Sequence, residues 1–177
     1  METFAAPKPL LPNPNFKAQK QSSLVDFKDH MIDVPIVEII ERFNRLPFCY
    51  TLQSCYGHFV FEGQPDQQSV NPLPATPITT TIEYRIAYIA FAIANSNAGR
   101  RFMIALSDLV VLDPDYIQFC SAEWFWKRQV NTYALQVEPD RFKHQDTAML
   151  NYSEALQVQA VRNTFFNHIQ QIAWESL

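Results

Sequence analysis

The sequence predicts a single α+β domain with a mixed or antiparallel sheet. The chain has 177 residues, of which 47% are apolar and 18% charged, an ordinary composition for one globular domain. Short segments with a strand-like pattern are interspersed with segments whose apolar residues recur at helical spacing. We therefore expect residues 24–177 to form the domain, with about three helices packed on the sheet.

Residues 1–23 precede this domain and are expected to form a flexible, extended arm. The stretch contains four prolines followed by a region rich in Lys, Gln and Ser. Proline lacks a backbone N–H, so it interrupts both helices and sheet ladders. Chain termini of this composition are commonly mobile, although a docking arm is the alternative. The prolines are Pro7, Pro9, Pro12 and Pro14.

A helix is expected between Asp33 and Pro47. Asp33 could cap its start, and Pro35 suits the first turn, where a missing N–H costs little. Pro47 ends the helix and leads into the next segment. The apolar residues at helical spacing are Ile36, Ile39, Ile40 and Phe43.

Two short strands, at 48–53 and 59–62, are expected to flank a polar turn at 54–58. The turn reads Ser-Cys-Tyr-Gly-His, and its Gly57 is one of only three glycines in the chain. A glycine here should supply a positive φ angle or allow a close approach to the backbone. The rest of the sequence can be arranged around this turn.

The turn supplies the candidate catalytic residues, which are Ser54, Cys55 and His58. A thiol or hydroxyl next to an imidazole could form a nucleophile–base pair, because the base must remove the proton of the nucleophile. The sequence does not identify a third group that would orient the imidazole. The plainer interpretation is a buried cysteine beside a turn, with a histidine at the surface.

A metal site is the second interpretation of the same turn. The spacing Cys55-x-x-His58 could begin such a site, with Cys49, Cys120 or His144 completing it. Zinc signatures usually contain a second closely spaced pair of ligands, and the sequence has none. We therefore expect no metal.

A long loop at 63–77 is expected after the turn. Its prolines and polar residues are typical of a surface loop, which could close over a site as a lid or could be an insertion without a role. Beyond it, residues 82–94 have a β-branched start and alternate apolar and polar residues, which favours a strand, although isoleucines at helical spacing also fit a helix. The later elements are a helix at 100–112, strands at 116–121 and 131–137, and a closing helix at 152–174 capped by Asn151 and Glu154.

An aromatic and basic cluster lies at 124–128, between the two later strands. It reads Trp-Phe-Trp-Lys-Arg, so its rings could stack on a base while its cations contact phosphate. On a strand, Trp124 and Trp126 would share one face. Core packing next to a solvated basic pair is the plainer interpretation.

The charge balance disfavours a broad nucleic-acid surface. The formal net charge is −4, and no run of Lys or Arg is longer than a pair. Three cysteines do not amount to a disulfide scaffold, and the start of the chain does not resemble a signal peptide. The longest apolar run, 86–94, is shorter than the roughly 20 residues that span a bilayer. We expect a soluble cytoplasmic protein with no membrane partner.

One known family resembles part of this sequence. The run Asp33-Val-Pro-Ile-Val-Glu-Ile-Ile-Glu-Arg-Phe-Asn44 leads through Leu46-Pro47 to Tyr50-Thr51-Leu-Gln-Ser54-Cys55-Tyr56-Gly57. It is similar to the tRNA wybutosine-synthesising methyltransferases of the wyosine pathway. That family has a helix that begins at Asp and ends near Asn, a proline link, a Thr, and a Ser-Cys-x-Gly motif followed by Arg. The resemblance covers residues 33–57.

The resemblance implies methyl transfer from S-adenosylmethionine to a tricyclic modified guanosine beside the phenylalanine anticodon of tRNA. It also implies a barrel-like mixed sheet with helices. Ser54 and Cys55 match the family's motif, while Thr51 and Gly57 would lie at the cofactor. The sequence departs from the family at three positions. His58 replaces the motif's arginine, Gln53 replaces a serine, and Gln136 stands where the family has a histidine.

The expected partner is therefore a small-molecule or nucleoside ligand. Binding of tRNA follows from the resemblance but is disfavoured by the net charge of −4. The alternative to an enzyme is a non-catalytic binding or assembly protein that retains the family's fold.

Overall fold

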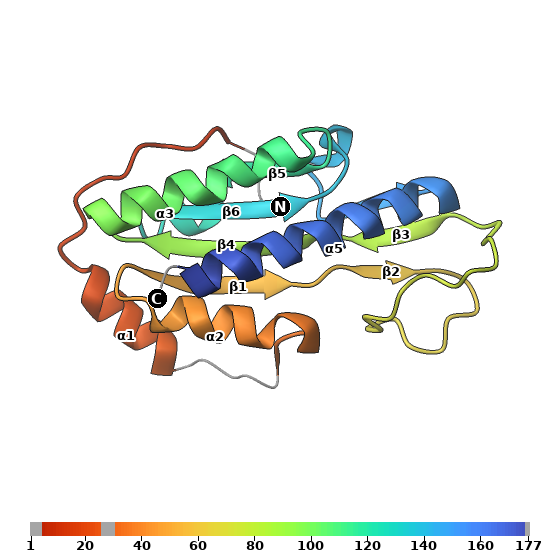
Figure 1. The fold of residues 1–177 in the computed structure, drawn as a ribbon, viewed down its shortest axis with the longest axis horizontal. Helices are drawn as coiled ribbons and strands as arrows, with labels where there is room; N and C mark the ends of the chain where they lie inside the picture. The colour runs from red at the N-terminus through yellow and green to blue at the C-terminus, as the bar shows by residue number, and fades with distance from the viewer. Residues whose placement is uncertain (1–4, 26–30, 176–177) are drawn as a thin grey trace.

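The computed structural model describes residues 5–25 and 31–175, and their fold is α+β as predicted (Figure 1). The described strands form two open antiparallel sheets, so they do not close into the barrel-like form that the family resemblance implies. The described residues contain five α-helices, against the three or so expected, because the helices at Phe16–Val25 and Glu123–Trp126 were not predicted.

The seven strands of the described residues are β1 (Cys49–Cys55), β2 (His58–Val60), β3 (Ile82–Arg85), β4 (Ala87–Ile93), β5 (Ile117–Ser121), β6 (Thr132–Val137) and β7 (Thr147–Leu150). The α-helices are α1 (Phe16–Val25), α2 (Val37–Arg45), α3 (Asn97–Asp108), α4 (Glu123–Trp126) and α5 (Tyr152–Glu175). The expected strands at 48–53, 59–62, 116–121 and 131–137 are confirmed within a few residues, whereas β7 was not predicted.

Two chain segments run through both sheets. The larger sheet has the order β1-β4-β6-β5 and the smaller one β2-β3-β7. β1 continues into β2 after Tyr56 and Gly57, and β3 continues into β4 after Ile86, so each segment changes sheet at a short break (Figure 1). The predicted turn at 54–58 is therefore too long: Ser54 and Cys55 belong to β1 and His58 to β2, and only Tyr56 and Gly57 form the break. The strand interpretation of 82–94 is confirmed, with this break inside it.

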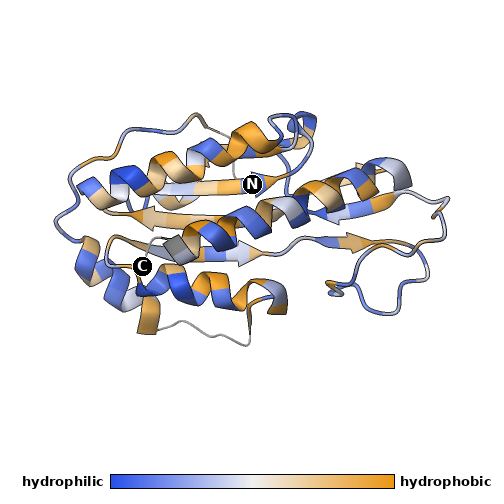
Figure 2. Cartoon of the chain, in the orientation of Figure 1, coloured by the Kyte–Doolittle hydropathy of each residue, from blue (hydrophilic) through white to orange (hydrophobic). Residues whose placement is uncertain are grey.

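Helices α2, α3 and α5 cover one face of the sheets, as Figure 1 shows. Between them and the strands lies an aromatic core in which Phe43, Phe91 and Phe102 meet edge to face, with ring centroids 5.2–5.7 Å apart. Hydrophilic and hydrophobic residues alternate along these helices in Figure 2, as expected of helices that bury one side only. No helix of the described residues has the length and apolar character needed to cross a bilayer.

The last part of the predicted extended arm is helical. Helix α1 occupies Phe16–Val25, beyond the last proline of the arm, where nothing interrupts a helix. Phe16 packs on Tyr50 with ring centroids 5.5 Å apart, and Lys20 donates to the backbone carbonyls of Leu46 and Cys49. The prediction of an extended segment is thus wrong for α1.

The extended part of the arm, residues 5–15, lies against the larger sheet. Ser121 N–H donates to the Ala5 carbonyl at 3.0 Å, and its hydroxyl accepts from Lys8 N–H at 2.8 Å. The side chain of Asn131 bonds both backbone groups of Leu11, each at 2.8 Å. This segment therefore has specific anchors, while its flexibility stays a prediction.

Candidate functional site

A β-bulge in β1 decides which of its side chains face the helices and which face the open side of the larger sheet. The register with β4 shifts between Thr51 and Gln53, so one extra residue is inserted there. Before the bulge, Thr51 lies opposite Phe91, which faces the helices. After the bulge, Cys55 lies opposite Tyr88. Gln53 and Cys55 therefore point to the sheet face that α2, α3 and α5 leave uncovered.

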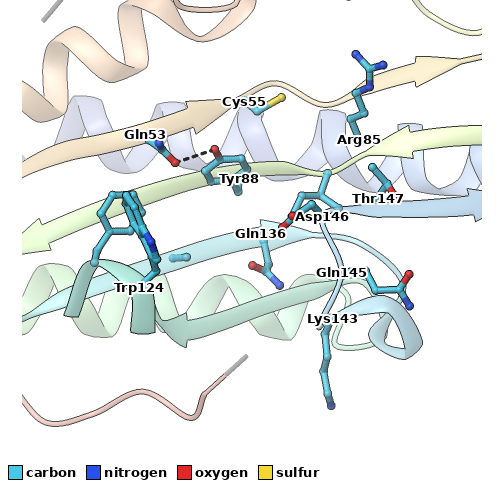
Figure 3. Close-up of a pocket in the computed structure, with 13 residues that line it drawn as sticks. Gln53, Cys55, Arg85, Tyr88, Trp124, Gln136, Lys143, Gln145, Asp146 and Thr147 are labelled. Atoms are coloured by element: carbon cyan, nitrogen blue, oxygen red, sulfur yellow. Dashed lines mark hydrogen bonds between the residues drawn. The ribbon is translucent and has the colours of Figure 1, made fainter. Parts of the chain in front are cut away.

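A cavity of about 490 Å³ lies on this open face (Figure 3). Cys55 lines it from β1, Tyr88 from β4 and Gln136 from β6. Trp124, on the short helix α4, lines the side away from Cys55. The Tyr88 hydroxyl donates to Gln53 at 3.3 Å. The cavity thus combines aromatic rings with amide groups, a usual lining for a small-molecule site.

Charged side chains of both signs also line the cavity. Arg85 is held by Glu83 at 3.0 Å, and Lys143 by Asp140 at 3.0 Å. Asp146 lies near them on the loop that precedes β7. The aromatic part of the cluster at 124–128 is helical, because it lies in α4. Trp124 lines the cavity, whereas Trp126 packs on Tyr133 with ring centroids 5.7 Å apart. The strand geometry considered for these two tryptophans is wrong.

A second feature meets the cavity at Cys55, namely a cluster of Asp33, Cys55 and His58. One potential ligand atom from each side chain lies within 4.8 Å of the other two. His58 Nε2 is 3.3 Å from Asp33 Oδ2, and His58 Nδ1 is 3.3 Å from the Ser69 carbonyl. The same Asp33 oxygen accepts the Tyr56 N–H at 2.7 Å. The break between β1 and β2 therefore carries an organised polar cluster.

The cluster favours a charged pair of His58 and Asp33. The hydrogen bond to Asp33, assisted by one to Cys55, raises the pKa of His58 to about 10. Burial acts to raise the pKa of Asp33, but bonds from His58 and the Tyr56 N–H outweigh it and lower that pKa. His58 is only 5% exposed, so its charge is stabilised by partners rather than by water.

Gly57 and Arg162 fix the backbone at this break. Gly57 has a φ of +92°, which confirms that the glycine supplies a positive φ. Its carbonyl accepts a 2.9 Å bond from Arg162 of α5, whose guanidinium lies 4.2 Å from the centroid of the Tyr56 ring. Arg162 is 2% exposed, and burial lowers its pKa. A cation buried in this way holds the chain between Cys55 and His58 in one conformation.

The structure brings together only some of the predicted site residues. Cys55, Gly57 and His58 lie together, and Asp33 is the orienting group that the sequence did not reveal. Ser54 lies opposite Ile89 on the helix-facing side of β1, so it points away from Cys55. The predicted role of Asp33 as a helix cap is wrong, since its side chain makes no capping bond. No pattern in the sequence distinguishes such a carboxylate from a cap.

Thr51, expected at the cofactor, lies farther back along β1. Its N–H and its hydroxyl are both bonded to the side-chain oxygen of Asn44 on α2, at 2.8 and 3.1 Å. Among the described residues, the metal-ligand group contains none of Cys49, Cys120 and His144, which were considered as completing it. Cys49 is buried against the Phe43 carbonyl, and Cys120 packs in a separate cluster on β5.

The sequence also did not indicate a buried carboxylate behind the cavity. Glu138 is fully buried, and its Oε1 accepts from Gln136 Nε2 at 2.5 Å. Burial raises the pKa of Glu138 to about 8. Its position directly after β6 and before Pro139 gives no sign of burial, because Glu is normally exposed. Through Gln136, this carboxylate orients an amide that faces the cavity.

The chain was compared with known proteins. No family model matches it, and no curated protein matches its sequence. Several solved structures have a similar course of the chain, and two of them follow. The PH1069 protein from Pyrococcus horikoshii is 12% identical with a TM-score of 0.46, covering 92% of this chain and 96% of that chain. A hypothetical protein from Aeropyrum pernix is 10% identical with a TM-score of 0.42, covering 80% and 97%. A likeness this weak carries no information about function.

Proposed function

We propose that this chain binds S-adenosylmethionine in the cavity beside Cys55 and acts as a methyltransferase on a modified nucleoside of tRNA. One observation supports this most directly. Cys55, which matches the motif of the wybutosine-synthesising methyltransferases, lines a cavity with ligand dimensions. The cytoplasm is the compartment in which such a protein would act on tRNA.

The cavity has the size and chemistry for such a ligand. Its volume of about 490 Å³ falls within the range of small-molecule sites. Tyr88 and Trp124 offer rings against which an adenine or another base can stack. Arg85 and Lys143 can contact a carboxylate or phosphate, while Asp146 suits an ammonium or ribose hydroxyl. Because the net charge is −4, contact with the tRNA would be confined to a short region around the modified base.

In this proposal Cys55 contacts the ligand, and His58 and Asp33 hold the Cys55 side chain in position. Methyl transfer to a nucleoside needs an aligned acceptor more than a protein nucleophile, so fixed geometry is the main contribution of the site. Ser54 faces the helices and would act through its backbone. The loop around Ser69, which bonds His58, would couple the cluster to the segment at 63–77.

Titration calorimetry with S-adenosylmethionine and S-adenosylhomocysteine tests the proposal. We expect heat of binding with the wild-type chain and about tenfold weaker binding for Trp124→Leu, because a stacked ring contributes roughly 1–3 kcal/mol. Trp174→Leu is the matched control, since Trp174 is 53% exposed and Trp124 is 45% exposed. The absence of heat with the wild-type chain at high concentration would contradict the proposal, as would equal losses in both variants.

A non-catalytic binding protein is the second candidate. It is favoured by His58, which replaces the arginine of the resembled family and is occupied by Asp33. A transfer assay with methyl-labelled S-adenosylmethionine and tRNA lacking the final modification separates the two candidates. Incorporation of label that is lost in Cys55→Ala supports the enzyme. Ligand binding without incorporation supports the binding protein.

A further inference from the structure

The polar cluster at the break between β1 and β2 has the composition of a metal centre. Asp33, Cys55 and His58 contribute a carboxylate, a thiol and an imidazole, and one potential ligand atom of each lies within 4.8 Å of the others. The carboxylate, thiolate and neutral imidazole are the three protein ligands that Zn²⁺ accepts most readily. Neither the resemblance nor the comparisons assign a metal to this chain.

We propose that Asp33, Cys55 and His58 bind a single Zn²⁺ ion, with its fourth coordination position left to water or to a ligand of the cavity. This proposal goes beyond the proposed function and does not depend on it. It also replaces the expectation from sequence that no metal would be bound, because that expectation assumed a second Cys or His as the missing partner.

The distance between the nitrogen and oxygen donors suits a tetrahedral ion. Zn–N and Zn–O bonds of about 2.0–2.2 Å place those two donor atoms roughly 3.4 Å apart in a tetrahedron. His58 Nε2 and Asp33 Oδ2 are 3.3 Å apart in the structure. An ion would therefore replace the proton shared by this pair without a change of backbone, as metal binding commonly displaces a proton.

The hydrogen bonds around the three ligands also favour a metal site. Zinc-bound histidines usually donate their second ring N–H to a backbone carbonyl, and His58 Nδ1 lies 3.3 Å from the Ser69 carbonyl. Asp33 Oδ2 accepts the Tyr56 N–H at 2.7 Å, and Cys55 Sγ accepts the Gly57 N–H at 3.4 Å. Each ligand is thus oriented by a backbone group, which is the usual second layer of a metal site.

The arrangement suits a metal better than a nucleophile–base pair. In a catalytic triad, one ring nitrogen faces the nucleophile and the other faces the carboxylate. Here Nε2 faces Asp33 and Nδ1 lies at the Ser69 carbonyl, so no ring nitrogen of His58 serves the Cys55 thiol alone. A common ion at the centre satisfies all three side chains at once.

The position and charge of the site favour an open, reactive ion over a purely structural one. Three protein ligands plus one free position is the pattern of catalytic zinc, whereas structural zinc has four protein ligands. Cys55 also lines the cavity, so an ion on its sulfur would lie at the cavity wall. A thiolate and a carboxylate together neutralise the charge of Zn²⁺, which permits burial beside His58.

Cobalt substitution tests the proposal on the full chain. The chain is stripped of metal with a chelator and titrated with Co²⁺, whose absorption reports ligand type and geometry. We expect one equivalent to bind, with visible bands of tetrahedral cobalt and a near-ultraviolet band from thiolate to cobalt. Zn²⁺ should then displace the cobalt and abolish both features. This experiment requires no variant and no S-adenosylmethionine, so its result is independent of the calorimetry.

Variants assign the ligands. Cys55→Ser should remove the thiolate band, and Asp33→Asn and His58→Gln should each weaken cobalt binding at least about tenfold. Cys120→Ala is the control, because it removes another thiol that lies in a separate cluster, and it should keep the wild-type spectrum. The proposal is overturned if the wild-type chain binds no stoichiometric cobalt, or if the thiolate band survives in Cys55→Ser and disappears in Cys120→Ala.

Discussion

Gly57 is the residue whose identity is most tightly constrained at the site. A Cβ atom added there would lie 2.9 Å from the Ala87 Cβ and 3.0 Å from the Tyr84 hydroxyl. Tyr84 cannot move aside easily, since its hydroxyl accepts from the Ala87 N–H and donates to the Val137 carbonyl, each at 2.9 Å. The φ of +92° adds a further cost for any residue with a Cβ.

We predict that Gly57→Ala lowers the free energy of unfolding by about 2–4 kcal/mol, from backbone strain and overpacking together. Gly63→Ala is the matched control, because Gly63 also has a positive φ, +82°, but no atom within 4 Å of the added Cβ. Its loss should be only about 1–2 kcal/mol. Urea denaturation measures both, and equal losses would show that crowding at Gly57 has no effect.

Glu138 makes the stability of the fold depend on pH. Its pKa is about 8 in the folded chain because of burial, with Asp146 and Asp140 adding repulsion and Gln136 partly offsetting it. The ordinary pKa is 4.5, so between those two values the folded chain holds a proton that the unfolded chain has released. Stability must then fall as pH rises through this range, by at most about 1.4 kcal/mol per pH unit.

Glu138→Gln should remove this dependence while keeping an oxygen that accepts from Gln136. We predict that the variant equals the wild-type chain in stability near the ordinary pKa and exceeds it near the shifted value of about 8. Chemical denaturation at a series of pH values gives the comparison. A wild-type chain that gained stability relative to the variant as pH rises would contradict the protonated, buried carboxyl.

At the scale of elements, Asn131 connects the N-terminal segment to the larger sheet. It is fully buried and has a φ of +65°, and its amide bonds both backbone groups of Leu11. Asn131→Gly keeps the backbone conformation but removes both bonds. We predict a loss of about 1–3 kcal/mol and faster proteolytic cleavage within residues 5–15, measured by limited proteolysis.

Asn151→Ala is the control for that experiment. Its side chain accepts the Glu154 N–H at 3.0 Å, which confirms the predicted cap of α5, and losing a cap costs about 1 kcal/mol. It should lower stability without exposing residues 5–15. Equal cleavage of both variants would indicate that the segment is released by general destabilisation rather than by loss of its anchor.

Elements with a strong local pattern were predictable, and those set by distant contacts were not. The apolar spacing of α2 and α5 and the β-branched start of 82–94 identify them correctly. The four residues of β7 have no comparable pattern and form a strand because β3 offers them a partner. Helix α1 directly follows the proline-rich stretch and has no apolar stripe, since Phe16 is its buried residue.

At the scale of the whole molecule, the site could be predicted only in part. The sequence places Cys55 and His58 together because they are close along the chain. Asp33 lies beside them because the chain passes this point just before α2 begins. Tyr88 lies opposite Cys55 because β1 pairs with β4. The bulge that turns Cys55 toward the cavity is set by register and leaves no mark in the sequence. Spatial neighbours of this kind require the fold.

Cys55 lines the cavity on the open face of the larger sheet, where we propose that the ligand binds. A crystal structure of the chain soaked with S-adenosylhomocysteine tests this proposal most directly. We expect the bound molecule in the cavity of about 490 Å³, in contact with Cys55 and with its adenine against Tyr88 or Trp124. A molecule bound elsewhere, or a cavity that stays vacant at saturating concentration, would contradict the account.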